Sequence, residues 1–223
     1  MLNINDYYKL VQYILNKNQS GNLTPDDFNR VINQAQVQYV SFLLGSFQQY
    51  TPGRPVPRVE LGNNQTVRQR LAPVIYGYEL AIDSTGFVSY PGDYIQTDAM
   101  WSIYGYSRIR YSQQDNLYSV YNSVIDPIAS NPIYLIEDEG FRFFPTTTGS
   151  AKLSYIRKPP RINWAYDEDV NGRPVYNPTT SEQPVWDEVT MWDIISRLLA
   201  MVGVNLQAGA VMQYANEIKQ LGQ

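Results

Sequence analysis

Three short runs of polar residues carry the side chains that could do chemistry in this chain. The first is DEDVNG, in which Asp167, Asp169 and Asn171 repeat the first half of a calcium-binding loop, whose ligands alternate along the chain. A complete loop needs a bidentate carboxylate at its twelfth position, and that position here is Pro178. A polar turn therefore explains the run better than a cation site does.

The second run, EDEG from Glu137 to Gly140, offers paired carboxylates. Two carboxylates placed on either side of a sugar can act as the acid and base of glycoside hydrolysis, and Trp and Tyr faces suit sugar stacking. A general acid needs burial to raise its pKa, whereas this run lies between two strand-like segments. We therefore expect solvated charges at a hairpin tip, including those of Glu139.

The third run is the basic cluster of Arg157, Lys158 and Arg161, which lies near Tyr155 and Trp164 in the sequence. Cations beside aromatic rings can contact nucleic acid by charge and stacking. The whole chain carries a net charge of −4, however, and an acidic surface repels DNA. We expect these cations to be exposed at a strand end or paired with carboxylates of a neighbour.

Composition removes most other chemistry, because the 223 residues include no Cys and no His. A thiol nucleophile, an imidazole base, a Ser-His-Asp triad and His or Cys zinc ligands are all excluded. No glycine-rich phosphate loop is present either, so we expect no cofactor. The first residues do not form a secretory signal and no run approaches the ~18 apolar residues of a membrane span, which predicts a soluble protein without a membrane partner.

Helices are expected at both ends of the chain. Apolar residues spaced three and four apart between Ile4 and Leu15 predict one amphipathic helix. A second helix is predicted to begin at Thr24, which can serve as its N-cap with Pro25 in the first helical position, and to end near Gly45. Toward the C-terminus two further helices are predicted, separated by Gly203.

Between the helices the pattern changes to short Tyr- and Ile-rich strands cut by Gly, Pro, Asn and Asp. We predict an α+β fold in which the terminal helices form a helical bundle with an inserted antiparallel β module, a sandwich or barrel, and long loops. Pro145 to Ser150 is expected to be a hairpin tip. The expected layout is a bundle at 1–49 and 186–223, a Pro-rich arm at 50–66, a β module at 67–160 and a long loop at 161–185.

The arm and the long loop have sequences that look unable to order themselves, so a partner is expected to order them. The residues predicted to contact a neighbouring subunit are Pro52, Arg54, Pro55, Pro57, Arg157, Lys158, Pro159, Pro160, Arg161, Trp164, Tyr166, Tyr176 and Trp186. Large contact surfaces of this kind are typical of an assembly subunit.

The order of these elements resembles that of the head-to-tail connector proteins of tailed bacteriophages. These are the adaptor, ring or tail tubular A-like proteins of short-tailed phages, and the sequence is most similar in style to ring proteins of crAss-like phages. The resemblance rests on a strand pattern followed by a loop and a helix, and on a Gly-Val-Asn-Leu ending from Gly203 to Leu206. The strand pattern comprises Pro132, Tyr134, Phe141, Pro145, Leu153, Tyr155, Arg157 and Pro159.

This resemblance implies a virion structural protein without enzymatic activity. Its members form a ring, commonly of twelve copies, that joins the portal protein to other ring or tail proteins and links capsid to tail. Genomic DNA passes through the channel without specific binding, and the ring is assembled in the host cytoplasm and retained in the virion neck. One alternative is a carbohydrate-binding or carbohydrate-active phage tail protein that uses the Tyr and Trp faces and the carboxylates of EDEG. Another is a binding module with a β sandwich that does not come from a phage.

Overall fold

The computed structural model describes residues 2–17, 23–46, 61–103, 107–117, 127–128 and 130–205. The fold is mixed α+β, with the helices and one two-stranded sheet in one part of the chain and two larger sheets in the other. Two compact units are present, one formed by Met1–Pro73 with Pro159–Gln223 and the other by Val74–Lys158. No helix among the described residues is long and apolar enough to cross a bilayer.

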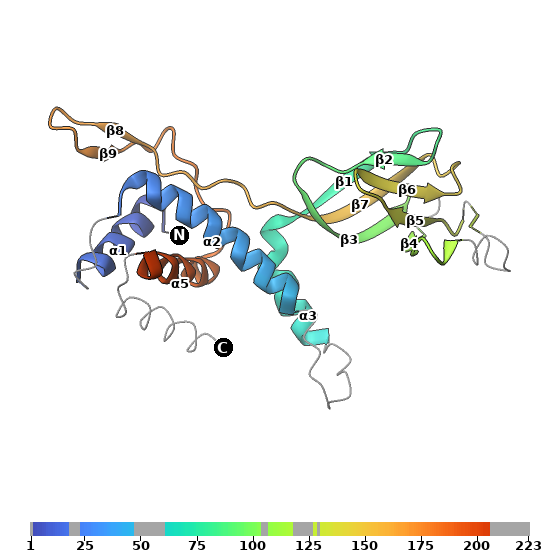
Figure 1. Ribbon diagram of the computed structural model, residues 1–223, viewed down its shortest axis with the longest axis horizontal. Coiled ribbons are helices and arrows are strands. Elements are labelled where there is room, and N and C mark those ends of the chain that lie inside the picture. The colour runs from blue at the N-terminus through green and yellow to red at the C-terminus, as the bar shows by residue number, and fades with distance from the viewer. Residues whose placement is uncertain are drawn as a thin grey trace. The chain divides into compact units, whose positions relative to one another are not determined.

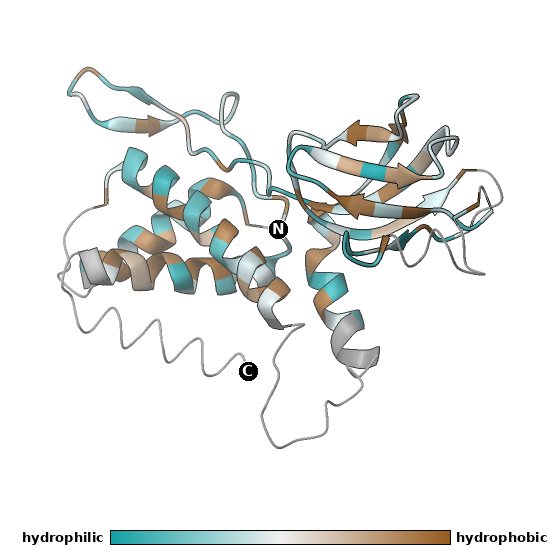
Figure 2. Ribbon diagram, turned by 45° about the vertical axis from the view of Figure 1, so that its right-hand side comes forward, coloured by the Kyte–Doolittle hydropathy of each residue, from teal (hydrophilic) through white to brown (hydrophobic). Residues whose placement is uncertain are grey.

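The first unit is helical (Figure 1). Its helices are α1 (Ile4–Lys17), α2 (Pro25–Ser46), α3 (Leu61–Leu71) and α5 (Glu188–Asn205), and a 3-10 turn, η1 (Ala72–Val74), follows α3 across the boundary between the units. Hydropathy varies from turn to turn along α1 and α2, as expected for helices with one apolar face (Figure 2).

Reciprocal hydrogen bonds cap both N-terminal helices. The backbone N–H of Asp6 donates to Asn3 Oδ1 (2.9 Å) and the N–H of Asn3 donates to Asp6 Oδ2 (3.1 Å). At α2 the N–H of Asp27 donates to Thr24 Oγ1 (3.2 Å), and the Thr24 hydroxyl donates to Asp27 Oδ2 (2.6 Å). Each pair satisfies amide donors that a helix start leaves open, so the predicted N-cap at Thr24 is confirmed.

Helix α2 packs against α5 to form the core of the helical unit. The buried apolar residues of the two helices are Phe28, Ile32, Ala35, Tyr39, Val40, Leu43, Met191, Ile194, Ile195, Leu198, Leu199 and Val202. Arg197 of α5 lies over the rings of Tyr39 and Phe42, at 5.0 and 4.8 Å from their centroids. Burial lowers the pKa of this guanidinium, and the two rings compensate part of the lost hydration.

Two boundaries predicted in the helical regions were wrong. The first of the two predicted C-terminal helices extends past its expected end at Val202, because α5 includes the buried Gly203 and runs to Asn205. The arm predicted at 50–66 and the β module predicted from 67 both overlap α3. The three prolines of the predicted arm all precede this helix, and Arg68 and Arg70 suit its C-terminal end. The helix predicted after 205 lies outside the described residues.

The second unit contains two sheets (Figure 1). A three-stranded antiparallel sheet has the order β1-β7-β3, formed by β1 (Ile75–Ala81), β7 (Ser150–Arg157) and β3 (Tyr94–Ser102). A four-stranded sheet has the order β2-β6-β5-β4, formed by β2 (Phe87–Ser89), β6 (Gly140–Phe144), β5 (Ile133–Ile136) and β4 (Arg110–Tyr111). Strands β4 and β5 pair in parallel, so the predicted purely antiparallel module is corrected to a mixed one, and the described strands form no closed barrel.

The segment from Pro145 to Ser150 is not a hairpin tip, as the sequence had suggested. Strand β6 pairs with β2 and β5, whereas β7 pairs with β1 and β3, so the chain passes from one sheet to the other here. Side chains of both sheets contribute to one core cluster: Leu80, Met100, Ile109, Tyr134, Phe141, Phe143, Ala151, Leu153 and Tyr155. Strands β6 and β7 therefore bury side chains in one cluster and do not pair with each other as a hairpin.

Close backbone packing fixes the residue at the start of β6. A Cβ placed on Gly140 would lie 2.1 Å from the carbonyl oxygen of Val88 on the paired strand β2. Because a side-chain carbon cannot approach a backbone oxygen so closely, only glycine fits this position.

Two tyrosines of the β unit should make its stability sensitive to alkaline pH. Burial raises the pKa of Tyr90 to about 12, and burial followed by the hydrogen bond to Asp93 raises the pKa of Tyr155 to about 12, from an ordinary value of 10.0. The folded protein therefore holds these two protons to higher pH than the unfolded chain does. We predict stabilisation that is complete below pH 10 and lost as the pH rises toward 12.

Denaturant unfolding at several alkaline pH values, together with tyrosinate absorbance, checks this prediction. The variant Tyr90→Phe should lose less stability between pH 10 and 12 than the unmodified protein. Ionisation of all tyrosines together near pH 10, with no late fraction, would contradict it.

Candidate functional site

The predicted basic cluster falls where the chain leaves the β unit. Arg157 ends β7 and its guanidinium lies over the ring of Tyr76, 5.3 Å from the centroid. Lys158 and Arg161 have exposed side chains, as predicted, while Pro159 between them is buried. The predicted cluster is thus split, because Arg157 is held against its own sheet and two cations remain at the surface.

Residues 160–187, which we name the strap, follow this point and lead to α5. Helix α2 binds the first part of the strap through side-chain amides. Asn29 Oδ1 accepts a hydrogen bond from the backbone N–H of Trp164 (2.8 Å), and Asn29 Nδ2 donates to the carbonyl of Trp164 (3.1 Å). Asn29 thus satisfies both main-chain groups of a single strap residue.

Asn33, one turn further along α2, repeats the arrangement two residues earlier in the strap. Its Oδ1 accepts from the N–H of Ile162 (2.9 Å) and its Nδ2 donates to the Ile162 carbonyl (2.7 Å). Gln36 Nε2 then donates to the carbonyl of Pro160 (3.5 Å). We call Asn29, Asn33 and Gln36 the amide clamp.

The spacing of the amide clamp follows from backbone geometry. Four helical residues, from Asn29 to Asn33, advance about 6 Å along the helix axis. Two extended residues, from Ile162 to Trp164, advance about 6.6 Å. The two repeats nearly match, so amides spaced four apart on a helix can pair with alternate residues of an extended segment running in the opposite direction.

The opposite edge of the strap is paired as well. Asn163 and Glu182 exchange backbone hydrogen bonds of 3.1 and 2.8 Å, and the N–H of Asn177 donates to the carbonyl of Ala165 (2.9 Å). Residues 160, 162 and 164 therefore face the amide clamp, while residues 163 and 165 face the returning part of the strap. Pairing on both edges accounts for the order of a segment that has no regular secondary structure.

Two tryptophans fix the strap to the helices. Trp186 is only 1% exposed, packs edge-on against Tyr39 at 5.7 Å between ring centroids, and donates its indole N–H to Gln36 Oε1 (2.8 Å). Trp164 is 3% exposed and donates its indole N–H to Asn5 Oδ1 of α1 (3.2 Å).

Trp164 is also the centre of an aromatic stack. The ring of Tyr8 on α1 stacks on it with centroids 4.4 Å apart, and those of Tyr166 and Tyr176 stack at 5.7 and 5.8 Å. Tyr166 and Tyr176 are paired residues of β8 (Tyr166–Glu168) and β9 (Pro174–Tyr176), the two strands of a hairpin within the strap. The stack therefore anchors the base of this hairpin to α1.

The calcium-like residues form the turn of the same hairpin. Asp169 Oδ1 accepts the backbone N–H groups of Asn171 (2.8 Å) and Arg173 (2.9 Å), and these bonds hold the pKa of Asp169 below its usual value, the Arg173 bond most strongly. Gly172 has a φ of 71°, which closes the turn. Asp167 accepts from Asn177 Nδ2 (2.9 Å) instead. Among the described residues no three metal-ligating side chains gather into a cation site.

The long loop predicted at 161–185 is mostly irregular, but it contains the β8–β9 hairpin, which the sequence did not predict. The sequence suggested that a partner must order this segment, whereas the amide clamp, Trp164 and Trp186 order it within one chain. Contact between a neighbouring subunit and Lys158, Pro160, Arg161, Tyr166 or Tyr176 stays a prediction, and Pro52, Arg54, Pro55 and Pro57 lie outside the described residues. The sequence signal for the clamp was the spacing of Asn29, Asn33 and Gln36, whose side-chain amides recur four and three residues apart on a predicted helix.

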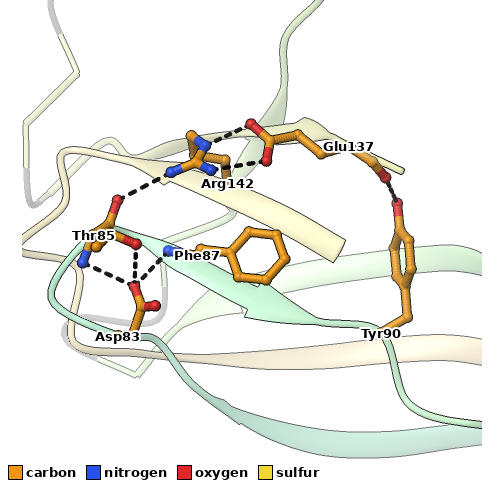
Figure 3. Close-up of polar contacts among 6 residues, drawn as sticks. All are labelled: Asp83, Thr85, Phe87, Tyr90, Glu137 and Arg142. Carbon is orange, nitrogen blue, oxygen red and sulfur yellow. Dashed lines mark hydrogen bonds and ion pairs between the residues drawn. The ribbon is translucent and has the colours of Figure 1, made fainter. Parts of the chain in front are cut away.

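The EDEG run does lie at the tip of the β5–β6 hairpin, as predicted (Figure 3). Asp138 and Glu139 are exposed, but Glu137 is paired. Its carboxylate accepts hydrogen bonds from Arg142 Nε (2.5 Å) and Nη2 (3.0 Å), and its main-chain carbonyl accepts from the hydroxyl of Tyr90 (2.7 Å).

The rest of this network joins the hairpin tip to β2. Arg142 Nη1 donates to the carbonyl of Thr85 (3.4 Å), and its guanidinium lies 5.5 Å from the centroid of the Phe87 ring. Asp83 Oδ1 accepts the N–H groups of Thr85 (2.8 Å) and Phe87 (2.9 Å), as Figure 3 shows. The carboxylate of Glu137 is held by two nitrogens of Arg142 within the same unit, which suits a structural corner of the sheet.

Comparison of the sequence with protein-family models and with curated proteins found no match. Function is therefore argued from the residues and their geometry.

The amide clamp generates a prediction about stability. Asn33→Ala leaves the N–H and carbonyl of Ile162 without partners, which should lower the free energy of unfolding by about 1–3 kcal/mol. The matched control is Gln34→Ala, because Gln34 is the next residue on the helix and is exposed. Denaturant unfolding monitored by tryptophan fluorescence measures both, and equal effects of the two substitutions would contradict the role of the clamp.

Proposed function

We propose that this protein is a subunit of an oligomeric ring in the portal–tail connector of a tailed phage, which links capsid to tail and surrounds the DNA channel. The observation that carries the proposal is the β8–β9 hairpin, an arm fixed at its base with an apolar residue at its tip. Val170 at the turn is completely exposed and Val175 is 52% exposed.

The far end of the hairpin adds nothing to the buried core of its own unit. An isolated two-stranded hairpin is marginally stable in water, and this one is supported at its base by the stack of Trp164 with Tyr166 and Tyr176. Beyond that stack, Val170 and Val175 contribute nothing to the buried core. An apolar tip on an anchored hairpin favours docking on another subunit. Its valines would be buried there without the entropic cost of ordering a loop.

The side chains considered for catalysis are used inside the protein, which supports a non-enzymatic role. Glu137 is bound to Arg142, and Asp169 is bound to the backbone of its own turn. The faces of Trp164 are stacked on tyrosines and Trp186 is buried, so neither indole is open to a sugar. These contacts weigh against the carbohydrate alternative.

In the proposed ring, α1, α2 and α5 belong to a helical bundle and the two sheets of the β unit form a sandwich. The exposed cations Lys158 and Arg161 and the Pro-rich residues 52–57 are proposed to contact neighbouring subunits, the portal protein or tail proteins. The net charge of −4 supports a channel that passes DNA without binding it. The proposed location is the virion neck, with twelve copies in a ring assembled in the host cytoplasm.

Native mass spectrometry and electron microscopy of the purified full chain test this proposal. We expect closed rings, and we expect Val170→Asp to shift the population toward smaller species by placing a charge in the contact. Thr180→Asp is the matched control, because Thr180 is an exposed turn residue of the same strap.

Thr180→Asp should assemble like the unmodified protein. A protein that is monomeric at all concentrations, or a Val170→Asp variant with unchanged assembly, would contradict the proposed role of the hairpin.

A further inference from the structure

The outer edge of β1 is a second surface of interest, distinct from the strap. Strand β1 pairs with β7 along all seven of its residues, and no other described strand lies on its far side. Among the described residues this edge is unpaired, and an edge of this length presents a row of main-chain donors and acceptors that can pair with another strand.

The register shows which main-chain groups face outward. The N–H of Ile82 donates to the carbonyl of Gly149 (3.1 Å), which continues the β1–β7 register by one residue. In an antiparallel pair, alternate residues direct both main-chain groups to the partner strand. Residues 76, 78 and 80 therefore bond to β7, and the N–H and carbonyl groups of 75, 77, 79 and 81 point to the open edge.

The other sheet edges are protected in ways that β1 is not. Strand β3 has register irregularities between Tyr94 and Gln96 and between Thr97 and Ala99, and its end is covered by the backbone bond from Ile109 to Met100. The edge strands of the second sheet, β2 and β4, have only three and two residues. Bulges and short strands are the usual means of preventing edge pairing, and β1 has neither a bulge, a lysine nor a proline.

The side chains of β1 point to the same conclusion. Tyr76 and Tyr78 lie on the face of the strand that carries the buried Leu80, because side chains alternate between faces. Nevertheless they are 47% and 48% exposed, while Leu80 is fully buried. The core-side face of the sheet therefore has two half-covered aromatic rings directly beside the open edge.

We propose that β1 pairs antiparallel with β1 of a second copy of this chain, about a two-fold axis that passes beside Tyr78. Tyr78 is the middle residue of Ile75–Ala81, so this register uses the whole strand. It places Gly77 opposite Glu79 of the second copy, and Tyr78 opposite Tyr78 of the second copy. The three-stranded sheets of the two copies then form one continuous six-stranded sheet.

The composition of the strand favours this register. Gly77 and Ala81, at outward-bonding positions, are small, and a Cβ on Gly77 would meet nothing within 4 Å. The two Tyr78 rings would form a cross-strand aromatic pair, an arrangement that stabilises antiparallel strands. Shifting the register by two residues toward the C-terminus would oppose Glu79 to Glu79, and such opposed like charges are destabilising.

This contact is independent of the proposed ring. A two-fold contact uses the same patch on both copies and closes on itself, whereas a ring needs two different patches. The contact would therefore produce dimers, or join two rings back to back, and its test does not depend on whether the hairpin drives ring assembly.

A single-cysteine variant tests the register, because the chain has no cysteine of its own. In the proposed pairing Tyr78 faces its counterpart at a site without hydrogen bonds, where Cα atoms are about 4.5 Å apart and a disulfide can form. We expect Tyr78→Cys to give a covalent dimer on mild oxidation, seen by non-reducing electrophoresis. Tyr111→Cys is the matched control, since Tyr111 is an exposed tyrosine on the edge strand β4 and should remain monomeric.

A main-chain substitution tests the hydrogen bonding. Gly77→Pro removes an outward N–H that β7 does not use, whereas Gly77→Ala keeps it, so sedimentation should show a dimer for the alanine variant and its loss for the proline variant. A Tyr78→Cys protein that stays uncrosslinked would overturn the proposal whether or not Gly77→Pro folds. Equal crosslinking of Tyr111→Cys, or crosslinking of Tyr78→Cys to another protein instead of to itself in the assembled particle, would also overturn it.

Discussion

The helical unit depends on one interaction, the binding of an extended main chain by side-chain amides of a helix. A segment that is neither helix nor sheet must place its N–H and carbonyl groups against some partner before it can be buried. Asn29 and Asn33 provide that partner on α2, and the returning part of the strap pairs with the opposite edge. With the main chain satisfied, Trp164 and Trp186 can be buried against the helices, which orders the strap.

The same interaction positions the surface that we associate with function. Trp164 is held by Asn29 through its main chain and by Asn5 through its indole, and its ring then supports Tyr166 and Tyr176. The hairpin is therefore fixed before any neighbour is met. A contact made by a fixed arm avoids the entropic cost that an unstructured loop would incur on docking, which suits a subunit that must join many copies in register.

Sequence patterns were sufficient for features that depend on local periodicity. The helix starts at Thr24 and near Ile4, the strand-rich middle of the chain and the position of EDEG between β5 and β6 all follow from such patterns. They were insufficient where distant residues decide the structure. The assignment of β6 and β7 to different sheets depends on burial of aromatic faces, and the order of the strap depends on amides more than a hundred residues away in sequence.

Site-resolved hydrogen exchange of the full chain, before and after assembly, tests most directly whether the arm is prebuilt. The amide protons of Ile162 and Trp164 should be protected in the unassembled protein as strongly as those of the helical core, because Asn33 and Asn29 accept them within one chain. The amide of Val170 itself, at the tip of the hairpin, should gain protection only on assembly. Rapid exchange at 162 and 164 until a partner is bound would contradict the account, since it would mean that the neighbour and not the amide clamp orders the strap.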